Sequence, residues 1–251
     1  MKRSVLPALG LTAALLLAAT GCGSDGSETT TATSSAAAAE TYGCLTPAQS
    51  AGAFRLAAPG ADLGAYYRDS TAGKAAVGLV FAPQAGGSLC DWQPYYDEFT
   101  AAGYAVVGWM AGGGGPGDVK AAIQLLKSHG ATSVALVGAS KGASASLEAA
   151  ADPAGAPLPI KAVVSLSSPE GYPGESDAAK AVLTGTVPSF FAAEEGDGRF
   201  PRTATQLHAT AVAPVKQLKI YPGSRHGAFL LADGALPDVR AFLTAHAPAQ
   251  G

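Results

Sequence analysis

Short apolar runs alternate with helix-like segments along most of this chain. The runs cover 75–81, 104–109, 133–137, 162–166, 189–193 and 217–221. Between them lie segments whose apolar residues recur at helical spacing, such as 118–129 and 237–246. Buried strands that alternate with helices are typical of a mainly parallel sheet with helices on both faces. The pattern therefore predicts an α/β fold.

Local signals refine this outline. Apolar stretches 53–57 and 63–67 flank the turn-forming residues 58–62, which predicts an antiparallel hairpin at the entrance of the domain. We expect Asp118 to cap one helix and Pro237 to open the last one. The only room for a lid lies between residues 169 and 186, which is too short for a large cap domain.

The first residues have the pattern of an export signal. Lys2 and Arg3 precede an apolar run, 5–19, and small residues lead to Cys22. The run is about fifteen residues long, whereas a membrane span needs roughly twenty. The ending Ala-Thr-Gly-Cys resembles a bacterial lipobox, in which the signal is cut before a cysteine that carries diacylglycerol. We expect a signal peptide over 1–21 and lipidation at Cys22; ordinary secretion with a spare cysteine is the alternative.

Residues 23–41 hold no large apolar side chain, so 22–41 is interpreted as a flexible tether and 42–251 as the folded domain. The expected location is the outer face of a bacterial cell membrane, reached through the lipid anchor, or the medium. Cleavage removes Lys2 and Arg3 from the 16 basic residues, so 14 basic residues face 19 acidic ones. This negative balance argues against nucleic acid as a partner.

Cys44 and Cys90 are the remaining cysteines. An isolated pair in an oxidising exported compartment favours a disulfide, with two free thiols as the alternative. The histidines are too scattered along the sequence to form a zinc motif with them, so we expect no metal.

The stretch Gly138-Ala139-Ser140-Lys141-Gly142 fits G-x-S-x-G between a buried run and an alanine-rich segment. This is the context of a nucleophile elbow, a sharp strand-to-helix turn that exposes a serine hydroxyl at a helix N-terminus. Its glycines remove side chains that would collide with neighbouring backbone. In a chain rich in glycine and serine, a turn without chemical meaning is the alternative.

A serine nucleophile needs a base, and the base needs an orienting acid. In this architecture both follow the serine in the chain, at later strand ends. The run 189–193 is followed by three carboxylates, Glu194, Glu195 and Asp197, and the run 217–221 by His226.

With these motifs the chain resembles the α/β hydrolases, in particular the compact dienelactone-hydrolase-like esterases and lipases. The resemblance covers about residues 50–248. It rests on G-A-S-K-G, on the acidic loop nine residues beyond Pro188, on Y-P-G-x-x-H-G, and on the segment 81–109, which is similar to the first crossover of that family with its oxyanion loop.

The resemblance implies a role for each residue. Ser140 attacks an acyl carbonyl, His226 takes and returns the proton, and Asp197 orients the imidazole. The N–H of Lys141 and that of Gln84 or Ala85 form the oxyanion hole. Asp197 is preferred as the acid because it lies between two glycines and where the family places its aspartate, whereas Glu194 or Glu195 is expected to continue the strand.

The substrate class follows only in outline. Few basic residues near the expected mouth, together with Phe190, Phe191 and Phe229, favour a small, partly apolar ester. Lys141 is interpreted as a solvated side chain, and so are the three other histidines, His129, His208 and His246. We expect a monomer that needs no cofactor.

Two other functions are weaker alternatives, because the first lacks an expected residue and the intact serine, acid and histidine argue against the second. The run 112–117 satisfies G-x-G-x-x-G, but the acidic residue that a dinucleotide site needs about twenty positions later is missing. The second alternative is a lipid-anchored binding protein or a degenerate hydrolase that keeps the pocket without turnover.

Overall fold

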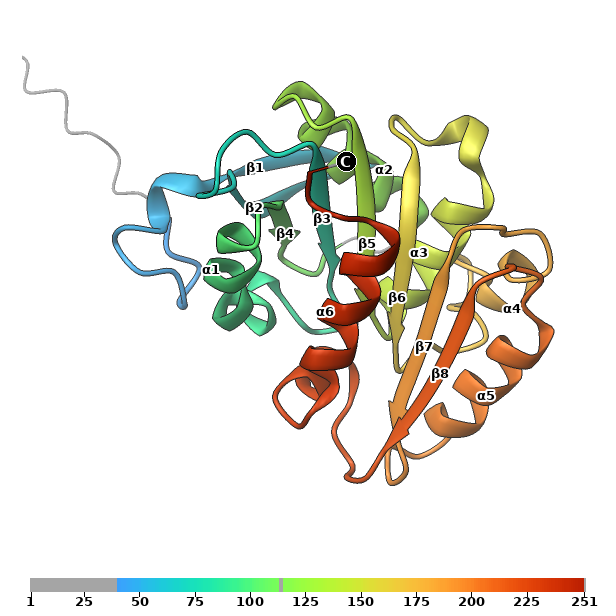
Figure 1. Ribbon diagram of the computed structural model, residues 1–251. Coiled ribbons are helices and arrows are strands. Elements are labelled where there is room, and N and C mark those ends of the chain that lie inside the picture. Colours follow the sequence, from blue (N-terminus) through green and yellow to red (C-terminus); the bar gives the residue numbers. More distant parts are fainter. Residues whose placement is uncertain (1–39, 113–114, 251) are drawn as a thin grey trace, which may run out of the picture. The chain divides into compact units, whose positions relative to one another are not determined.

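The computed structural model describes residues 40–112 and 115–250, which form an eight-stranded sheet. Its strands are β1 (Ala53–Ala58), β2 (Ala61–Arg68), β3 (Val77–Ala82), β4 (Ala105–Trp109), β5 (Ser133–Ala139), β6 (Ile160–Leu166), β7 (Ser189–Glu194) and β8 (Lys216–Tyr221). They lie in the order β1-β2-β4-β3-β5-β6-β7-β8 (Figure 1). β2 is antiparallel to both β1 and β4, and all other pairs are parallel. The predicted hairpin and the mainly parallel sheet are confirmed.

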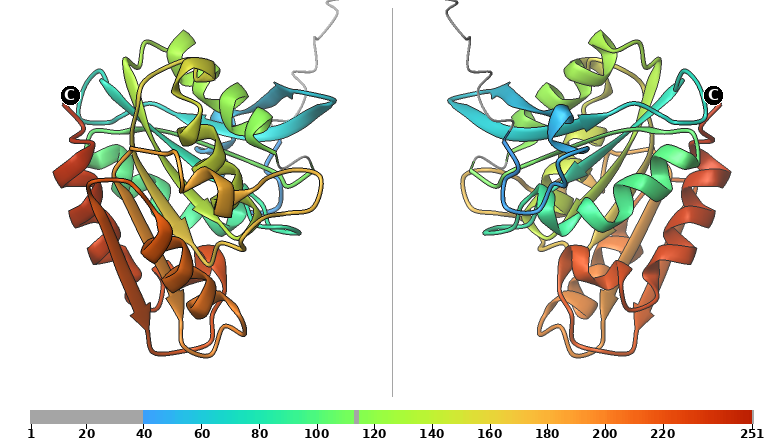
Figure 2. Two further views of the ribbon diagram at one scale, coloured as in Figure 1. Left: turned by 90° about the vertical axis from the view of Figure 1, so that its right-hand side faces the viewer. Right: turned by 90° about the vertical axis from the view of Figure 1, so that its left-hand side faces the viewer.

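Helices cover both faces of this sheet (Figures 1 and 2). They are α1 (Gln93–Ala101), α2 (Pro116–Ser128), α3 (Lys141–Ala151), α4 (Ala178–Ala181), α5 (Phe200–Thr210) and α6 (Ala235–His246). Alternate strand residues point to opposite faces, so Leu79 and Phe81 pack in the core under α1 and α6, and Val80 packs in the core under α2, α3 and α5. The continuous apolar runs of the sequence therefore correspond to strands buried on both faces.

Two predicted helix starts differ from the structure. α2 begins at Pro116 with Gly115 at the N-cap, so Asp118 lies inside the first turn and does not cap the helix. Proline suits this first position because its missing N–H would have no partner inside the helix. α6 begins at Ala235, two residues before Pro237.

The segment between β6 and β7 contains no cap domain. It holds an isolated bridge between Tyr172 and Ser176 and the single-turn helix α4. The absence of a large cap domain between β6 and β7 is what the length of this segment predicts.

The predicted disulfide is present. Cys44 and Cys90 are bonded, with Cα atoms 5.6 Å apart and 46 positions of chain between them. The bond joins the entry segment to η2 (Leu89–Asp91), a short 3-10 helix that follows the expected oxyanion loop. The alternative of two free thiols is wrong.

The expected signal peptide, the lipidation site Cys22 and nearly all of the tether lie outside the described residues. Within 40–112 and 115–250, no helix is long and apolar enough to cross a membrane.

Candidate active site

Ser140 occupies a sharp turn between β5 and α3. Its backbone has φ 48° and ψ −114°, a conformation that side chains rarely adopt. A Cβ at Gly138 would lie 2.4 Å from the Gly142 oxygen, and one at Gly142 would lie 2.4 Å from the Ala82 oxygen. Both positions are thus restricted to glycine by backbone contacts, as the elbow motif predicts.

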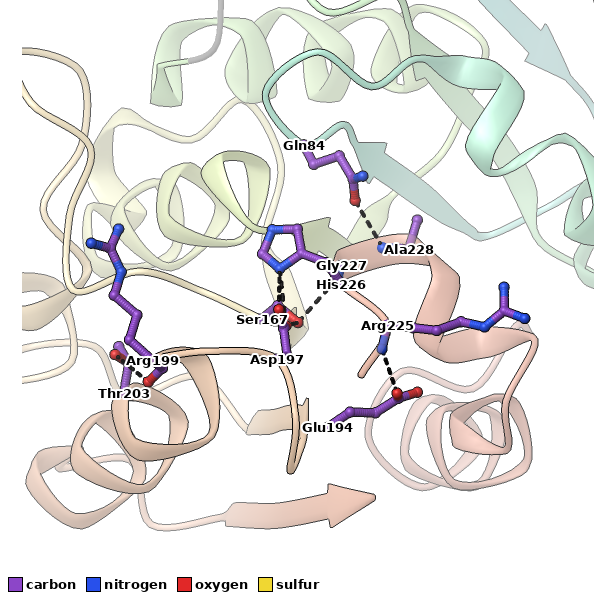
Figure 3. A network of polar contacts seen from close by, with 10 residues as sticks. All are labelled: Gln84, Ser167, Glu194, Asp197, Arg199, Thr203, Arg225, His226, Gly227 and Ala228. Atoms are coloured by element: carbon purple, nitrogen blue, oxygen red, sulfur yellow. Dashed lines mark hydrogen bonds and ion pairs between the residues drawn. The ribbon is translucent and has the colours of Figure 1, made fainter. Parts of the chain in front are cut away.

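His226 and Asp197 meet at the same edge of the sheet (Figure 3). His226 follows β8 and immediately precedes η4 (Gly227–Leu231), whereas Asp197 lies in the loop between β7 and α5. The imidazole Nδ1 is 3.0 Å from Asp197 Oδ1 and 2.9 Å from Oδ2. The aspartate side chain is 9 % exposed and the histidine side chain 31 % exposed. A nearly buried carboxylate is therefore paired with an imidazole that solvent can reach.

The serine and the histidine are brought together through their neighbours in the chain. A Cβ at Gly227 would lie 3.1 Å from the Ala139 Cβ, so the residue after His226 packs against the residue before Ser140. In the described part of the chain no hydrogen bond joins Ser140 Oγ to His226. Such bonds are often long in the free enzyme and shorten when substrate binds.

The other two carboxylates of the acidic loop have different surroundings. Glu194 is the last residue of β7 and is fully buried, and its Oε2 accepts a hydrogen bond from the Arg225 N–H at 2.5 Å. Glu195 is exposed. Asp197 is thus the member of this group that lies against His226, and Glu194 does continue the strand.

The expected oxyanion loop follows β3. In the described residues, the N–H groups of Gln84 and Ala85 donate no hydrogen bond, and the Lys141 N–H lies at the N-terminus of α3. The Gln84 side chain accepts a hydrogen bond from the Ala228 N–H at 3.1 Å, which ties this loop to the histidine loop (Figure 3). The loop after β3 thus offers two backbone N–H groups, of Gln84 and Ala85, that make no hydrogen bond within the described residues.

A cavity of about 250 Å³ adjoins the elbow. Its walls come from the oxyanion loop, the end of β4, the start of α2 and the first turns of α3, including Gln84, Ala85, Trp109, Val119, Lys141 and Ala145. Gly112 and Gly115 also line it, whereas the two glycines between them lie outside the described residues. Two described residues of the glycine run thus border the candidate active site.

Lys141 is not the solvated side chain that we expected. Its ammonium lies 2.6 Å from Glu175 Oε2 and 4.7 Å from the centre of the Tyr172 ring, and the side chain is only 12 % exposed. The sequence could not reveal this pair because Glu175 belongs to the loop after β6. The lysine charge at the cavity wall is therefore neutralised by a nearby carboxylate.

Two arginines lie beside the site, contrary to the expectation of few basic residues there. Arg199 and Arg202 line a hollow of about 480 Å³ next to the loop 169–171. Every other arginine that the structure describes pairs with a carboxylate, but these two form no ion pair in that part of the chain. Phe200, between them, has its ring centre 4.3 Å from that of His226.

The apolar residues predicted at the mouth are mostly elsewhere. Phe190 and Phe191 are fully buried in the core on the two faces of the sheet, because they are consecutive residues of β7. Phe229 is 41 % exposed. The expectation that all three shape the substrate site is therefore wrong for the first two.

The three other histidines, His129, His208 and His246, each pack against an aromatic ring. His129 stacks on Tyr67, and His246 packs on Phe242. Among the described residues no group of three or more histidine, cysteine, aspartate or glutamate side chains could hold a metal ion.

The sequence analysis missed one polar residue at the site. Ser167 follows β6 directly, is fully buried, and donates a hydrogen bond from its hydroxyl to Asp197 Oδ2 at 2.7 Å. The position of this serine directly after a buried strand is a sequence feature that could have indicated it, but no motif marks the residue.

Several proteins of known structure share the fold of this chain. No family model and no curated protein matches the chain. Solved structures do: an esterase from Pyrococcus furiosus has TM-score 0.63 and 15 % identity, covering 77 % of this chain and 91 % of that one. A dienelactone hydrolase from Anabaena variabilis has TM-score 0.61 and 17 % identity, covering 77 % and 96 %. An alpha-beta serine hydrolase homologue from Coxiella burnetii has TM-score 0.56 and 19 % identity, covering 77 % and 95 %. The described chain therefore has the fold of the α/β hydrolases.

Proposed function

We propose that this protein is a serine hydrolase that cleaves small carboxylic esters through an acyl-enzyme intermediate. The observation that carries the proposal is the elbow serine, Ser140, at the sheet edge where the His226–Asp197 pair lies. Each of the three residues follows a different strand, β5, β7 or β8, so the sheet and not local sequence brings them together.

The proposed reaction proceeds in two halves. Ser140 Oγ attacks the ester carbonyl while His226 Nε2 takes the hydroxyl proton, and the alcohol leaves with that proton. Water then attacks the acyl-enzyme with His226 again as base, which releases the carboxylic acid and restores the serine. Asp197 accepts the Nδ1 proton as a hydrogen bond, which leaves Nε2 free to act and stabilises the imidazolium.

The negative oxygen formed in each half needs donors that are already in place. The N–H of Lys141 and that of Gln84 or Ala85 are proposed to bind it. Donors of this kind contribute roughly 3 to 4 kcal/mol each to transition-state stabilisation. The N-terminus of α3 adds its positive partial charge at the same point.

The cavity beside the elbow limits the substrate. At about 250 Å³ it suits a small acyl or alcohol group, and Trp109, Val119 and Ala145 give it an apolar wall. Arg199 and Arg202 lie outside this cavity. A substrate panel should pair neutral esters with esters that carry a carboxylate, because only the latter could form ion pairs with these arginines.

The proposal is tested by Ser140→Ala on the soluble domain. The variant should lose labelling by a fluorophosphonate probe and hydrolysis of p-nitrophenyl acetate, because only an activated serine reacts with both. Ser146→Ala is the matched control, since Ser146 is a buried hydroxyl on α3 without a partner in the described residues, and it should keep both activities.

Undiminished turnover by Ser140→Ala would exclude the serine mechanism. A wild-type domain that binds esters but neither labels nor turns over would instead favour the alternative function, a lipid-anchored binding protein or degenerate hydrolase.

We also propose that the domain acts outside the cytoplasm, anchored through Cys22 at the end of a lipoprotein signal. The Cys44–Cys90 disulfide supports an oxidising compartment.

A further inference from the structure

Ser167 lies behind the His226–Asp197 pair and contacts both of the loops that carry it. Its Oγ is 2.7 Å from Asp197 Oδ2 and accepts a hydrogen bond from the Gly227 N–H at 3.0 Å (Figure 3). Asp197 follows β7, Gly227 follows β8, and Ser167 itself follows β6. One hydroxyl thus joins the ends of three neighbouring strands.

The directions of these bonds are fixed by chemistry. The Gly227 N–H can only donate, so the hydroxyl oxygen accepts there and its single proton is directed to Asp197. Asp197 Oδ2 is therefore an acceptor in this contact. A carboxylate that accepts from both Ser167 and His226 requires the imidazole proton on Nδ1, which leaves Nε2 able to take the proton of Ser140.

Asp197 has few other groups to stabilise its charge. In the described part of the chain its carboxylate is hydrogen-bonded only by His226 and Ser167, although its side chain is just 9 % exposed. A buried carboxylate is costly unless donors replace the lost water. Removal of the hydroxyl would leave the imidazole as its one protein donor.

The backbone at Ser167 is also unusual. Its φ is 50°, and Tyr42 and Ser140 are the only other non-glycine residues in the described chain with positive φ. Such a conformation is energetically unfavourable for a non-glycine residue and persists where the surrounding structure requires it. Ser140 and Ser167 follow adjacent strands, β5 and β6, so the two strained serines lie side by side at the site.

We propose that Ser167 is a positioning residue of this active site: it holds the Asp197 carboxylate and the histidine loop so that the imidazole keeps the tautomer that catalysis needs. This inference rests on the proposed hydrolase function and adds a fourth side chain to it.

Ser167→Ala tests the role of the hydroxyl. With p-nitrophenyl acetate, kcat should fall about tenfold to hundredfold, the effect of one hydrogen bond to a charged group, while KM stays within about twofold. The acid limb of the kcat/KM profile should move to higher pH, because a carboxylate with one donor fewer stabilises the imidazolium more strongly. A purely structural role would not move this limb in a folded variant.

Two further variants keep the test decisive. Ser167→Gly removes the hydroxyl and relieves the strained φ, so it should be more stable than Ser167→Ala and yet equally slow. Ser165→Ala is the matched control, because Ser165 lies on β6, the strand that Ser167 follows, is 1 % exposed and has no partner in the described residues. It should retain kcat and the wild-type pH profile.

A second readout does not depend on turnover. The proton on Nδ1 of an imidazole bonded to a carboxylate gives a downfield NMR signal, which should shift or broaden in Ser167→Ala and Ser167→Gly but not in Ser165→Ala. A wild-type protein that neither labels with fluorophosphonate nor cleaves esters would refute the hydrolase function, and this signal would still test the positioning role. Retention of kcat within twofold, together with an unchanged acid limb and an unchanged NMR signal, would overturn the inference.

Discussion

At the scale of single residues, three carboxylates that are close in the sequence differ in their burial and in the groups that they contact. Glu194 points from the end of β7 to the Arg225 N–H, Glu195 is exposed, and Asp197 reaches the imidazole. One oxygen of Glu194, Oε1, is buried without a partner in the described residues. Glu194 is thus placed to hold the backbone of the histidine loop, and Asp197 to serve as the acid.

Substitution of Asp197 by asparagine should lower kcat by about 10⁴, because a neutral amide cannot stabilise the imidazolium and can hold the wrong tautomer. Glu195→Gln should have almost no effect, since its charge is exposed and screened. Glu194→Gln should cost roughly tenfold or less, because its contact to the loop persists with a neutral oxygen as acceptor. Steady-state kinetics of the three variants with one neutral ester would measure these effects. If Glu194→Gln lost most of its activity while Asp197→Asn kept it, the assignment of Asp197 as the acid would be wrong.

The sequence predicted Ser140, Asp197 and His226 as one group because each follows a buried strand in an order known for one fold. Ser167 escaped because a serine after a strand is common and only the contact itself distinguishes it. Lys141 was misjudged for a related reason, since its partner Glu175 lies in another loop. Contacts between side chains of different loops depend on geometry that spacing alone does not supply.

At the scale of elements, the site depends on neighbouring strands whose loops are joined by hydrogen bonds. The acid loop donates two backbone hydrogen bonds to the end of β8 and the loop after it, from the Glu195 N–H to the Tyr221 oxygen and from the Gly196 N–H to the Gly223 oxygen. β5, β6, β7 and β8 are adjacent in chain order, so their succession in the sequence does predict which loops meet. The reversed order of β3 and β4 could not be deduced in the same way.

The Cys44–Cys90 disulfide is the covalent link between elements. For the 46-position separation that it closes, the chain-entropy model gives about 4 kcal/mol of stabilisation as an upper value. Replacement of both cysteines by alanine should therefore lower Tm by roughly 8 to 16 °C in a domain of this size. Calorimetry with and without reductant measures the effect, and reductant should not change the Tm of the double variant.

Activity at 25 °C should survive this change, because the bond joins the entry segment to η2 and neither cysteine is a triad residue or an expected oxyanion donor. An unchanged Tm would contradict the stabilising role. A double variant with the wild-type Tm but without activity would mean that the disulfide holds the expected oxyanion loop in place instead of stabilising the domain.

At the scale of the whole molecule, the disulfide of the described domain agrees with the export that the first residues predict. The disulfide was expected because the first residues predict export, and it is present in the domain. No helix in the described part of the chain is long and apolar enough to cross a membrane. Cys22, outside the described residues, is where the sequence predicts a lipid anchor.

Cys22→Ser tests that anchor in bacterial cells that express the full chain. Stable attachment needs two or more lipid chains, each contributing about 0.8 kcal/mol per buried CH₂ group, and a serine cannot accept the thioether-linked diacylglycerol. The wild-type protein should sediment with membranes and enter the detergent phase, whereas the variant should stay aqueous or appear in the medium. The domain from residue 42 onward is the matched control, and it should hydrolyse esters at the rate that the full chain shows. Wild-type protein found in the medium, with a free thiol at Cys22, would favour ordinary secretion instead.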